Sequence, residues 1–193
     1  MENLSEWIPG LFLGIALSAG SGFRVFIPAL VSNLAGKFGV VEVAGNFSWM
    51  TSDTLTWILG LACLLEIGAY YVPFIDNLLD TVALPVSFAA GALITTSFIK
   101  IDDPVLQWGL GIVAGGGVAG TIQAGTGLLR LASTKFTAGF GNGIFSTIEN
   151  IISFFISFMA IWLPVFMGVL VLYLVYRVIR ALTGKKQKQP ADH

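Results

Sequence analysis

The sequence predicts an all-α membrane protein, and the main evidence is its composition and the length of its apolar runs. Of the 193 residues, 55% are hydrophobic and only 11% are charged, and the mean hydropathy is +0.85. A soluble domain has about 25% charged residues, so this chain offers too little polar surface for solvation by water. The apolar runs are long and do not alternate with polar residues, which favours helices over barrel strands.

Six apolar segments predict about six transmembrane helices, each close to the ~20 residues that cross a bilayer. The third segment is the clearest, because it is uncharged between Asp80 and Lys100. The last two are divided at Trp162-Leu163-Pro164, because one helix over both would be about twice as long as the hydrocarbon core is thick. The predicted spans, with ends uncertain by a few residues, cover about 9–35, 54–72, 81–99, 105–130, 143–161 and 164–182.

A weak internal repeat predicts two halves of three spans each. Each half has a glycine-rich stretch in its first span, an acidic residue in its second (Glu66, then Glu149) and a Leu-Pro-Val sequence afterwards. Because three is odd, the second half is expected to be inverted relative to the first, as in many secondary transporters. The predicted organisation is one transmembrane domain over residues 1–183, with repeats at about 5–100 and 104–183, and a basic polar tail over 184–193.

Both glycine-rich stretches are predicted helix breaks. Glycine costs about 1 kcal/mol in a helix interior and proline about 3 kcal/mol, and Pro28 follows the first stretch closely. A close contact between two helices is the alternative, because small residues also allow tight crossings. The residues concerned are Gly20, Ser21 and Gly22 in the first stretch, and Gly115, Gly116 and Gly117 in the second.

Charged and polar residues inside the spans are the candidates for a site. A charge at the centre of a span costs about 2.5–3.5 kcal/mol, so it should face protein or water and should have a partner. Arg24 lies near the middle of the first span, and Glu66 is its first expected partner. A purely structural ion pair is the alternative, and Asp76 and Asp80 could also lie in a solvated turn. The predicted substrate or ion pathway comprises Arg24, Glu66, Asp76, Asp80, Glu149 and Asn150.

Several classes of protein are disfavoured by what the chain contains. With one cysteine, Cys63, and one histidine, His193, it has no Cys/His cluster for a metal, so neither a metal nor another cofactor is expected. A glycine pattern over 115–120 resembles a dinucleotide fingerprint but lies in an apolar span without a preceding strand. No convincing catalytic set is present. The basic tail is expected to contact anionic lipid and not nucleic acid.

Lysine and arginine residues predict the orientation, because they accumulate on the cytoplasmic side. They are concentrated in the tail and in the Arg130–Lys135 loop. With six spans both termini would be cytoplasmic, and the loops at 36–53 and 100–103 would lie outside. An odd number of spans would instead place the acidic N-terminus opposite the basic tail, which the same rule allows.

The run Ala19-Gly20-Ser21-Gly22-Phe23-Arg24-Val25-Phe26-Ile27-Pro28 resembles the signature of a bacterial membrane family catalogued as domain of unknown function 4126. The resemblance covers about Leu11 to Pro164. Later matching positions are Glu66, Pro73, Asp76, Asp80, Ala114–Gly117, Arg130, Thr137, Gly139, Asn142, Ser146 and Glu149. The chain departs from the pattern at Tyr70-Tyr71, where Asp-Lys is usual, and at Asn150, where an acid is usual. The resemblance implies a bacterial inner-membrane location and no settled activity.

These observations predict a small transporter or channel for an ion or small solute, with a polar site at the repeat interface. A non-catalytic membrane scaffold or complex subunit is the first alternative, and a membrane-embedded enzyme acting on lipid ranks last. The expected partners are membrane lipid, the unknown solute and, given the many small residues, further copies of the chain.

Overall fold

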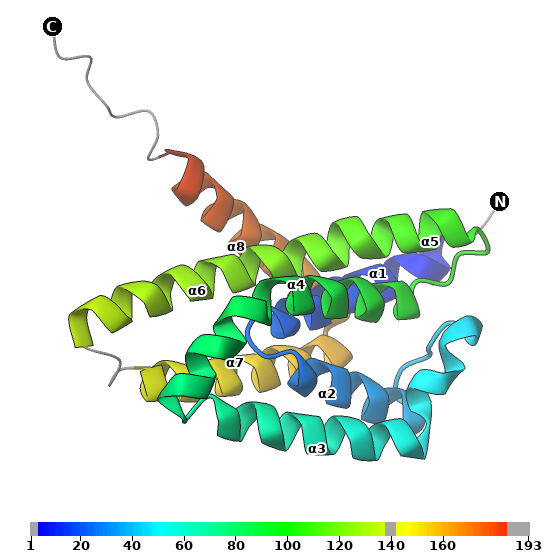
Figure 1. Cartoon of the computed structure of the whole chain (residues 1–193). Coiled ribbons are helices and arrows are strands. Elements are labelled where there is room, and N and C mark those ends of the chain that lie inside the picture. The colour runs from blue at the N-terminus through cyan, green and yellow to red at the C-terminus, as the bar shows by residue number, and fades with distance from the viewer. Residues whose placement is uncertain (1–3, 138–141, 185–193) are drawn as a thin grey trace, which may run out of the picture.

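The computed structural model describes residues 4–137 and 142–184, and every regular element in these ranges is a helix. The predicted all-α fold class is therefore confirmed. The helices form a bundle whose long axis lies across the page in Figure 1. The elements are α1 Leu4–Ser21, α2 Phe26–Lys37, the 3₁₀ helix η1 Gly45–Thr51, α3 Asp53–Ala69, α4 Pro73–Phe98, α5 Pro104–Leu110, the π-helical segment η2 Gly111–Gly116, α6 Gly117–Thr137, α7 Asn142–Trp162 and α8 Pro164–Gly184.

Helices α1 and α2 form a hairpin that enters and leaves the bundle at the same end. In α1, Gly10 packs against the main chain of Phe98, where α4 ends. After α2, the N–H of Ala44 donates to the carbonyl of Ser97 at 2.8 Å. Both ends of the hairpin therefore lie beside the C-terminus of α4, while its turn at residues 22–25 lies in the middle of the bundle (Figure 1).

The predicted helix break in the first glycine stretch is present, but the predicted single crossing over residues 9–35 is wrong. The chain reverses at the break and does not continue to the other end. The glycines bring the turn into close contact with other helices. A Cβ atom on Gly20 would lie 2.7 Å from the hydroxyl of Ser157 in α7, and one on Gly22 would lie 2.7 Å from the carbonyl of Ala119 in α6.

The second glycine stretch is not a break, so the prediction at Gly115, Gly116 and Gly117 is corrected. Elements α5, η2 and α6 follow one another without interruption, and the π-helical turn absorbs the irregularity. A Cβ atom on Gly115 would overlap the side chain of Thr95 and the carbonyl of Gly91, both in α4. These glycines therefore allow close helix packing. The two halves do not share the glycine-broken first helix that the inverted repeat predicted.

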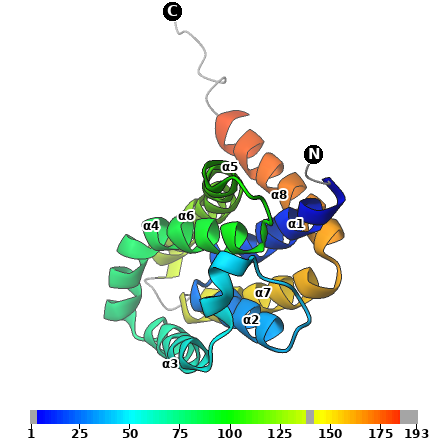
Figure 2. The same cartoon turned by 90° about the vertical axis from the view of Figure 1, so that its right-hand side faces the viewer.

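Helix α1 lies at the centre of the bundle and packs against α4, α7 and α8. Ser18 donates to the carbonyl of Gly91 at 2.8 Å, which joins α1 to α4 within the core. Figure 2 shows the bundle from the end at which α1 begins, with α3 at its edge. The main apolar cluster comprises Leu13, Ala16, Leu17, Ile94, Phe98, Ala160 and Met167.

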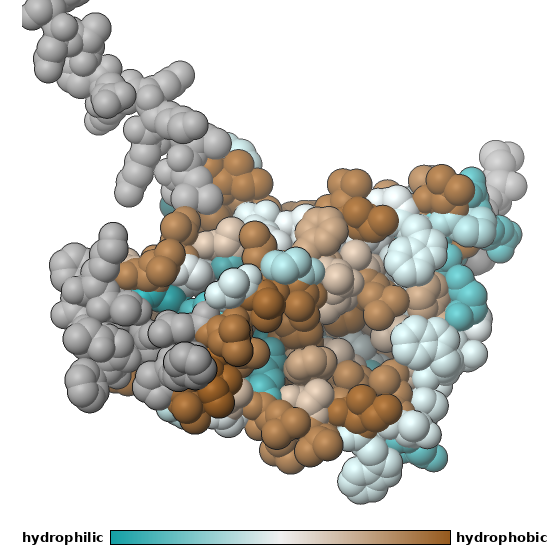
Figure 3. Space-filling model, in the orientation of Figure 1, coloured by the Kyte–Doolittle hydropathy of each residue, from teal (hydrophilic) through white to brown (hydrophobic). Residues whose placement is uncertain are grey.

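The outer surface is apolar, as expected for contact with lipid. Brown, hydrophobic side chains cover much of the face in Figure 3, and Trp57 on α3 is 80% exposed. By length and composition, three helical stretches can cross a membrane, Leu78–Phe98, Pro104–Ala132 and Gly143–Trp162, and a fourth if η1 and α3, bent by 59°, form one span. The structure is therefore compatible with a multi-pass membrane protein, although the described residues contain fewer such stretches than the six predicted.

The described chain begins and ends at opposite ends of the bundle (Figure 1). Helix α8 runs parallel to α1, because Gly168 meets Phe12 and Val171 packs with Ala19. It then continues beside α6 and away from the end at which α1 begins. This arrangement does not fit six crossings with both termini on one side, because the α1–α2 hairpin replaces a crossing with a return.

Candidate functional site

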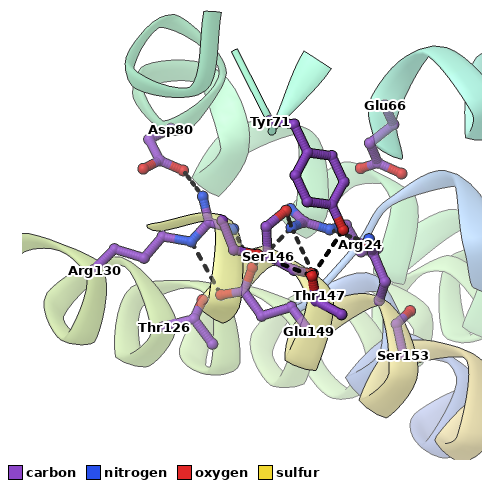
Figure 4. Close-up of polar contacts among 12 residues, drawn as sticks. Arg24, Glu66, Tyr71, Asp80, Thr126, Arg130, Ser146, Thr147, Glu149 and Ser153 are labelled. Atoms are coloured by element: carbon purple, nitrogen blue, oxygen red, sulfur yellow. Dashed lines mark hydrogen bonds and ion pairs between the residues drawn. The ribbon is translucent and has the colours of Figure 1, made fainter. Parts of the chain in front are cut away.

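The hairpin turn places Arg24 inside the bundle, where its side chain is only 1% exposed. Its Nε donates to Oδ1 of Asn150 at 2.6 Å, and its Nη2 donates to the hydroxyl of Ser146 at 2.6 Å. The same Nη2 lies 3.1 Å from Oε2 of Glu149. All three partners come from the first half of α7, so the tip of the hairpin is held against that helix (Figure 4).

A second buried arginine, Arg130 of α6, shares the carboxylate of Glu149. Its Nε donates to Oε1 of Glu149 at 3.0 Å, and its Nη2 contacts Oε2. Its Nη1 donates to Oδ1 of Asp80 on α4 at 3.0 Å. The result is a chain of alternating charges, Arg24–Glu149–Arg130–Asp80, that joins the hairpin tip to α7, α6 and α4 (Figure 4). We refer to these four residues as the ion-pair network.

The ring of Tyr70 covers both guanidinium groups of the network. Its centroid lies 3.7 Å from Cζ of Arg24 and 4.5 Å from Cζ of Arg130. A cation over an aromatic face gains about 0.5–2 kcal/mol, and more as water is excluded. The aromatic ring at this position therefore stabilises two buried cations without adding a further carboxylate to the network.

Glu66 does not pair with Arg24, which corrects the predicted partner. Its Oε1 accepts from the backbone N–H of Val25 at 2.8 Å, and its Oε2 accepts from that of Phe26 at 3.0 Å. These N–H groups begin α2, and Val25, at the N-cap position, supplies no side-chain cap of its own. The first N–H groups of a helix need acceptors from outside it. The break before α2 leaves such groups at Val25 and Phe26, and Glu66 supplies their acceptors.

Glu66 also lines a groove of about 350 Å³ beside α3 and α4. Most of its lining is apolar, and the polar exceptions include Ser87 and Gln123, whose side chains contact each other at 3.4 Å. Glu149 does not line this groove. The two glutamates therefore do not border one cavity, as the repeat had suggested. A larger groove of about 650 Å³ between α6, α7 and α8 is lined by apolar residues and Thr126.

The structure brings most of the predicted pathway residues together. Arg24, Glu149, Asn150 and Asp80 are linked in or beside the ion-pair network. The side chain of Asp76 lies outside the described residues. In the described part of the chain, no group of three or more His, Cys, Asp or Glu is placed to hold a metal.

Sequence reasoning assigned Arg130 to a loop and missed its place in the network. A signal was present, because Leu128, Leu129 and Leu131 surround it in the sequence. An arginine inside such an apolar run is as costly as Arg24 and needs a partner in the same way. The aromatic contact of Tyr70 had no comparable signal, because it depends on how the hairpin tip meets α3.

Comparison with known proteins identifies one relationship. No curated protein and no solved structure matches the chain significantly. The family model described as Domain of unknown function (DUF4126) matches residues 11–183, which is most of the chain. The protein belongs to this family of unknown function.

Proposed function

We propose that the protein is a small membrane transporter or channel for an ion or small solute, with its site at the tip of the α1–α2 hairpin. The observation that carries the proposal is the irregular backbone at residues 22–25, buried inside an apolar bundle beside Arg24. Non-helical backbone at membrane depth is tolerated only where protein covers it or where it lines a cavity. Intramembrane charges likewise mark ion and substrate pathways by default.

The ion-pair network would act as a closed gate in such a transporter. It extends from the buried Arg24 to Asp80, whose side chain is 27% exposed. A solute that moves from the hairpin tip toward Asp80 must separate at least one ion pair of the network. Paired groups with two alternative sets of partners are a common basis for switching between two states.

We propose that the end of the bundle with the C-terminus of α6 and of α8 faces the cytoplasm of a bacterial inner membrane. Arg177 and Arg180 lie in the last turns of α8, and the tail adds further lysines. At the opposite end, Lys37 and Lys100 are matched by Asp53 and Glu42. There the hydrogen bond and the charge of Lys100 lower the pKa of Glu42. The proposed topology has the N-terminus outside and five crossings. Four are the stretches named above, in α3, α4, α5–η2–α6 and α7, and α8 is added because its apolar residues are exposed. This topology satisfies the positive-inside rule.

Flux measurements in proteoliposomes test the transport proposal. Vesicles that contain the wild-type protein should release small ions or solutes faster than empty vesicles. Asp80→Asn, which removes a charge from the partly exposed end of the network, should change the rate several-fold. Arg177→Ala is the matched control, because Arg177 lies on the surface of α8 and contacts Tyr173. If folded wild-type protein carries no small cation, anion or neutral solute, the proposal is wrong.

A membrane scaffold or subunit is the second candidate, and the close packing around the site favours it. The Nε and Nη2 groups of Arg24 are both paired with residues of α7, and the glycines of η2 fit tightly against α4. If the protein is a scaffold, vesicles that contain it should show no flux, and Asp80→Asn should change only the stability of the protein.

A further inference from the structure

The groove beside α3 and α4 has an apolar lining with Glu66 as its charged side chain. Its volume of about 350 Å³ is within the range of pockets that hold small organic ligands, roughly 300–1,000 Å³. Leu65 of α3 and Val86 of α4 line the groove and are 64% and 42% exposed, so the groove opens on the apolar outer surface of the bundle. A ligand that enters there comes from the lipid and needs a mostly apolar body.

Glu66 places a negative charge in the groove without a cation against it. In the described part of the chain, no lysine or arginine forms an ion pair with its carboxylate. The two buried cations, Arg24 and Arg130, are already matched by Glu149 and Asp80. The dipole of α2 offsets about half of an elementary charge, but Glu66 lies in the last turn of α3, whose dipole supplies a similar charge of opposite sign. The groove therefore has a net negative charge.

Aromatic side chains are a second, independent feature that favours a cation. Phe23 and Phe26 of the hairpin line the groove, and so does Tyr70 at the end of α3. Aromatic faces attract cations through the ring quadrupole. Tyr70 is only 7% exposed, and its hydroxyl forms no hydrogen bond with the residues that the structure describes. A buried hydroxyl without a partner costs free energy, and a ligand that donates N–H groups supplies one.

We propose that this groove binds a lipophilic organic cation, with its ammonium group against Glu66 and its apolar body between α3 and α4. The carboxylate keeps its bonds to the N–H groups of Val25 and Phe26, because each carboxylate oxygen can accept a second hydrogen bond. Nothing has to leave the site. A bare Mg²⁺ or Ca²⁺ ion fits less well, because it needs about six oxygen ligands and the lining is mostly apolar.

This proposal rests on the proposed transport function for its biological role, because it names the substrate class of the site at the hairpin tip. Binding itself does not depend on transport and is measured without a membrane gradient.

Three compounds with the same apolar body test the role of the charge. The bridgehead amine, alcohol and carboxylic acid of adamantane are a cation, a neutral molecule and an anion at neutral pH. Equilibrium dialysis of the purified full-length protein in detergent, with protein-free micelles as the reference, measures the binding of each. The amine should bind saturably and about tenfold or more tighter than the alcohol, because its hydrogen bond to Glu66 is charged on both sides. The carboxylate should bind more weakly than the alcohol.

Two variants test whether the ligand lies in this groove. Glu66→Gln removes the charge and keeps an oxygen for one N–H of α2, so it should weaken binding of the amine about tenfold or more and that of the alcohol less than about twofold. Ala62→Phe places a ring in the groove and leaves Glu66 unchanged, so it should abolish binding of both compounds. Ile58→Phe, one turn earlier on α3, is 57% exposed outside the groove. This matched control should bind like the wild type.

Equal binding of the amine and the alcohol to the wild type, or the absence of saturable binding of the amine, would overturn the proposal. Undiminished binding of the amine by Ala62→Phe would do the same, and this result does not depend on whether Glu66→Gln folds. Glu66 would then be a structural cap. Saturable binding of the amine that Ala62→Phe abolishes, in a protein without any flux, would retain the cation site and remove the transport function. Flux of other solutes by a protein that does not bind the amine would retain transport and remove this site.

Discussion

Glu149 lies between two guanidinium groups, so one carboxylate stabilises two buried cations. It contacts Arg24 at 3.1 Å and Arg130 through both of its oxygens. Removing one partner of a buried ion pair is far more costly than removing a surface charge, because the remaining charge stays desolvated. The network is therefore expected to be sensitive to single substitutions and more tolerant of paired ones.

We predict that Glu149→Gln lowers the free energy of unfolding by about 3–5 kcal/mol, because Arg24 and Arg130 lose a shared counter-charge. Asp80→Asn should cost less, since Asp80 is partly exposed. The double variant Arg24→Gln/Glu149→Gln should lose less than the sum of its single variants, by about 0.5–3 kcal/mol. Unfolding measured in detergent micelles checks this. Strict additivity would show that the pair contributes no interaction.

For individual residues, the sequence predicted that Arg24 contacts a carboxylate but not which carboxylate it contacts. The cost of a charge in an apolar span predicted that Arg24 would be shielded and paired with a carboxylate, and it is. Glu66 was the first expected partner, but Glu149 also lies within a later apolar segment and meets the same requirement. The choice depends on the hairpin turn, which directs the Arg24 side chain to α7 and the following N–H groups to α3.

Two glycine-rich stretches of similar composition form different elements, and their neighbours account for the difference. The first ends at a helix N-terminus that Glu66 caps, so a break is stabilised there. The second lies against α4, where the backbones at Gly115 and Gly91 are in close contact. Glycine permits both outcomes. Composition therefore predicted where the two irregular stretches lie. Whether each becomes a helix break or a close packing contact depends on long-range contacts, which the sequence pattern does not contain.

We predict that Gly115→Ala destabilises the protein by about 1–3 kcal/mol, because the added methyl group would overlap Thr95 and the Gly91 carbonyl. Gly117→Ala, two residues later in the same continuous helical stretch, is the matched control. A Cβ there meets nothing within 4 Å, so this change should be neutral or stabilising by up to about 1 kcal/mol. Thermal unfolding of both variants checks the contact. Equal effects at the two positions would contradict the packing of η2 on α4.

For the whole molecule, apolar runs predicted a multi-helix membrane bundle, and most predicted spans overlap a helix of the structure. The number of crossings was less predictable, because a broken helix that continues and one that turns back have the same hydropathy. The hairpin is visible only in tertiary contacts, such as that between Ala44 and Ser97. One reversal of this kind moves the N-terminus to the other side of the membrane.

Cysteine labelling in intact cells distinguishes the hairpin from a single crossing. In a Cys63→Ser background, we predict that an impermeant maleimide labels both Ser5→Cys and Val40→Cys from outside, because α1 begins where α2 ends. Val72→Cys, in the exposed turn between α3 and α4, should react only after the cells are opened. A single crossing would place positions 5 and 40 on opposite sides, since about 27 apolar residues would separate them and ~20 suffice to span the core. Protection of Ser5→Cys together with labelling of Val40→Cys would therefore rule out the hairpin, whereas labelling of both would place Arg24 at the tip of a segment that enters and leaves on the outer side.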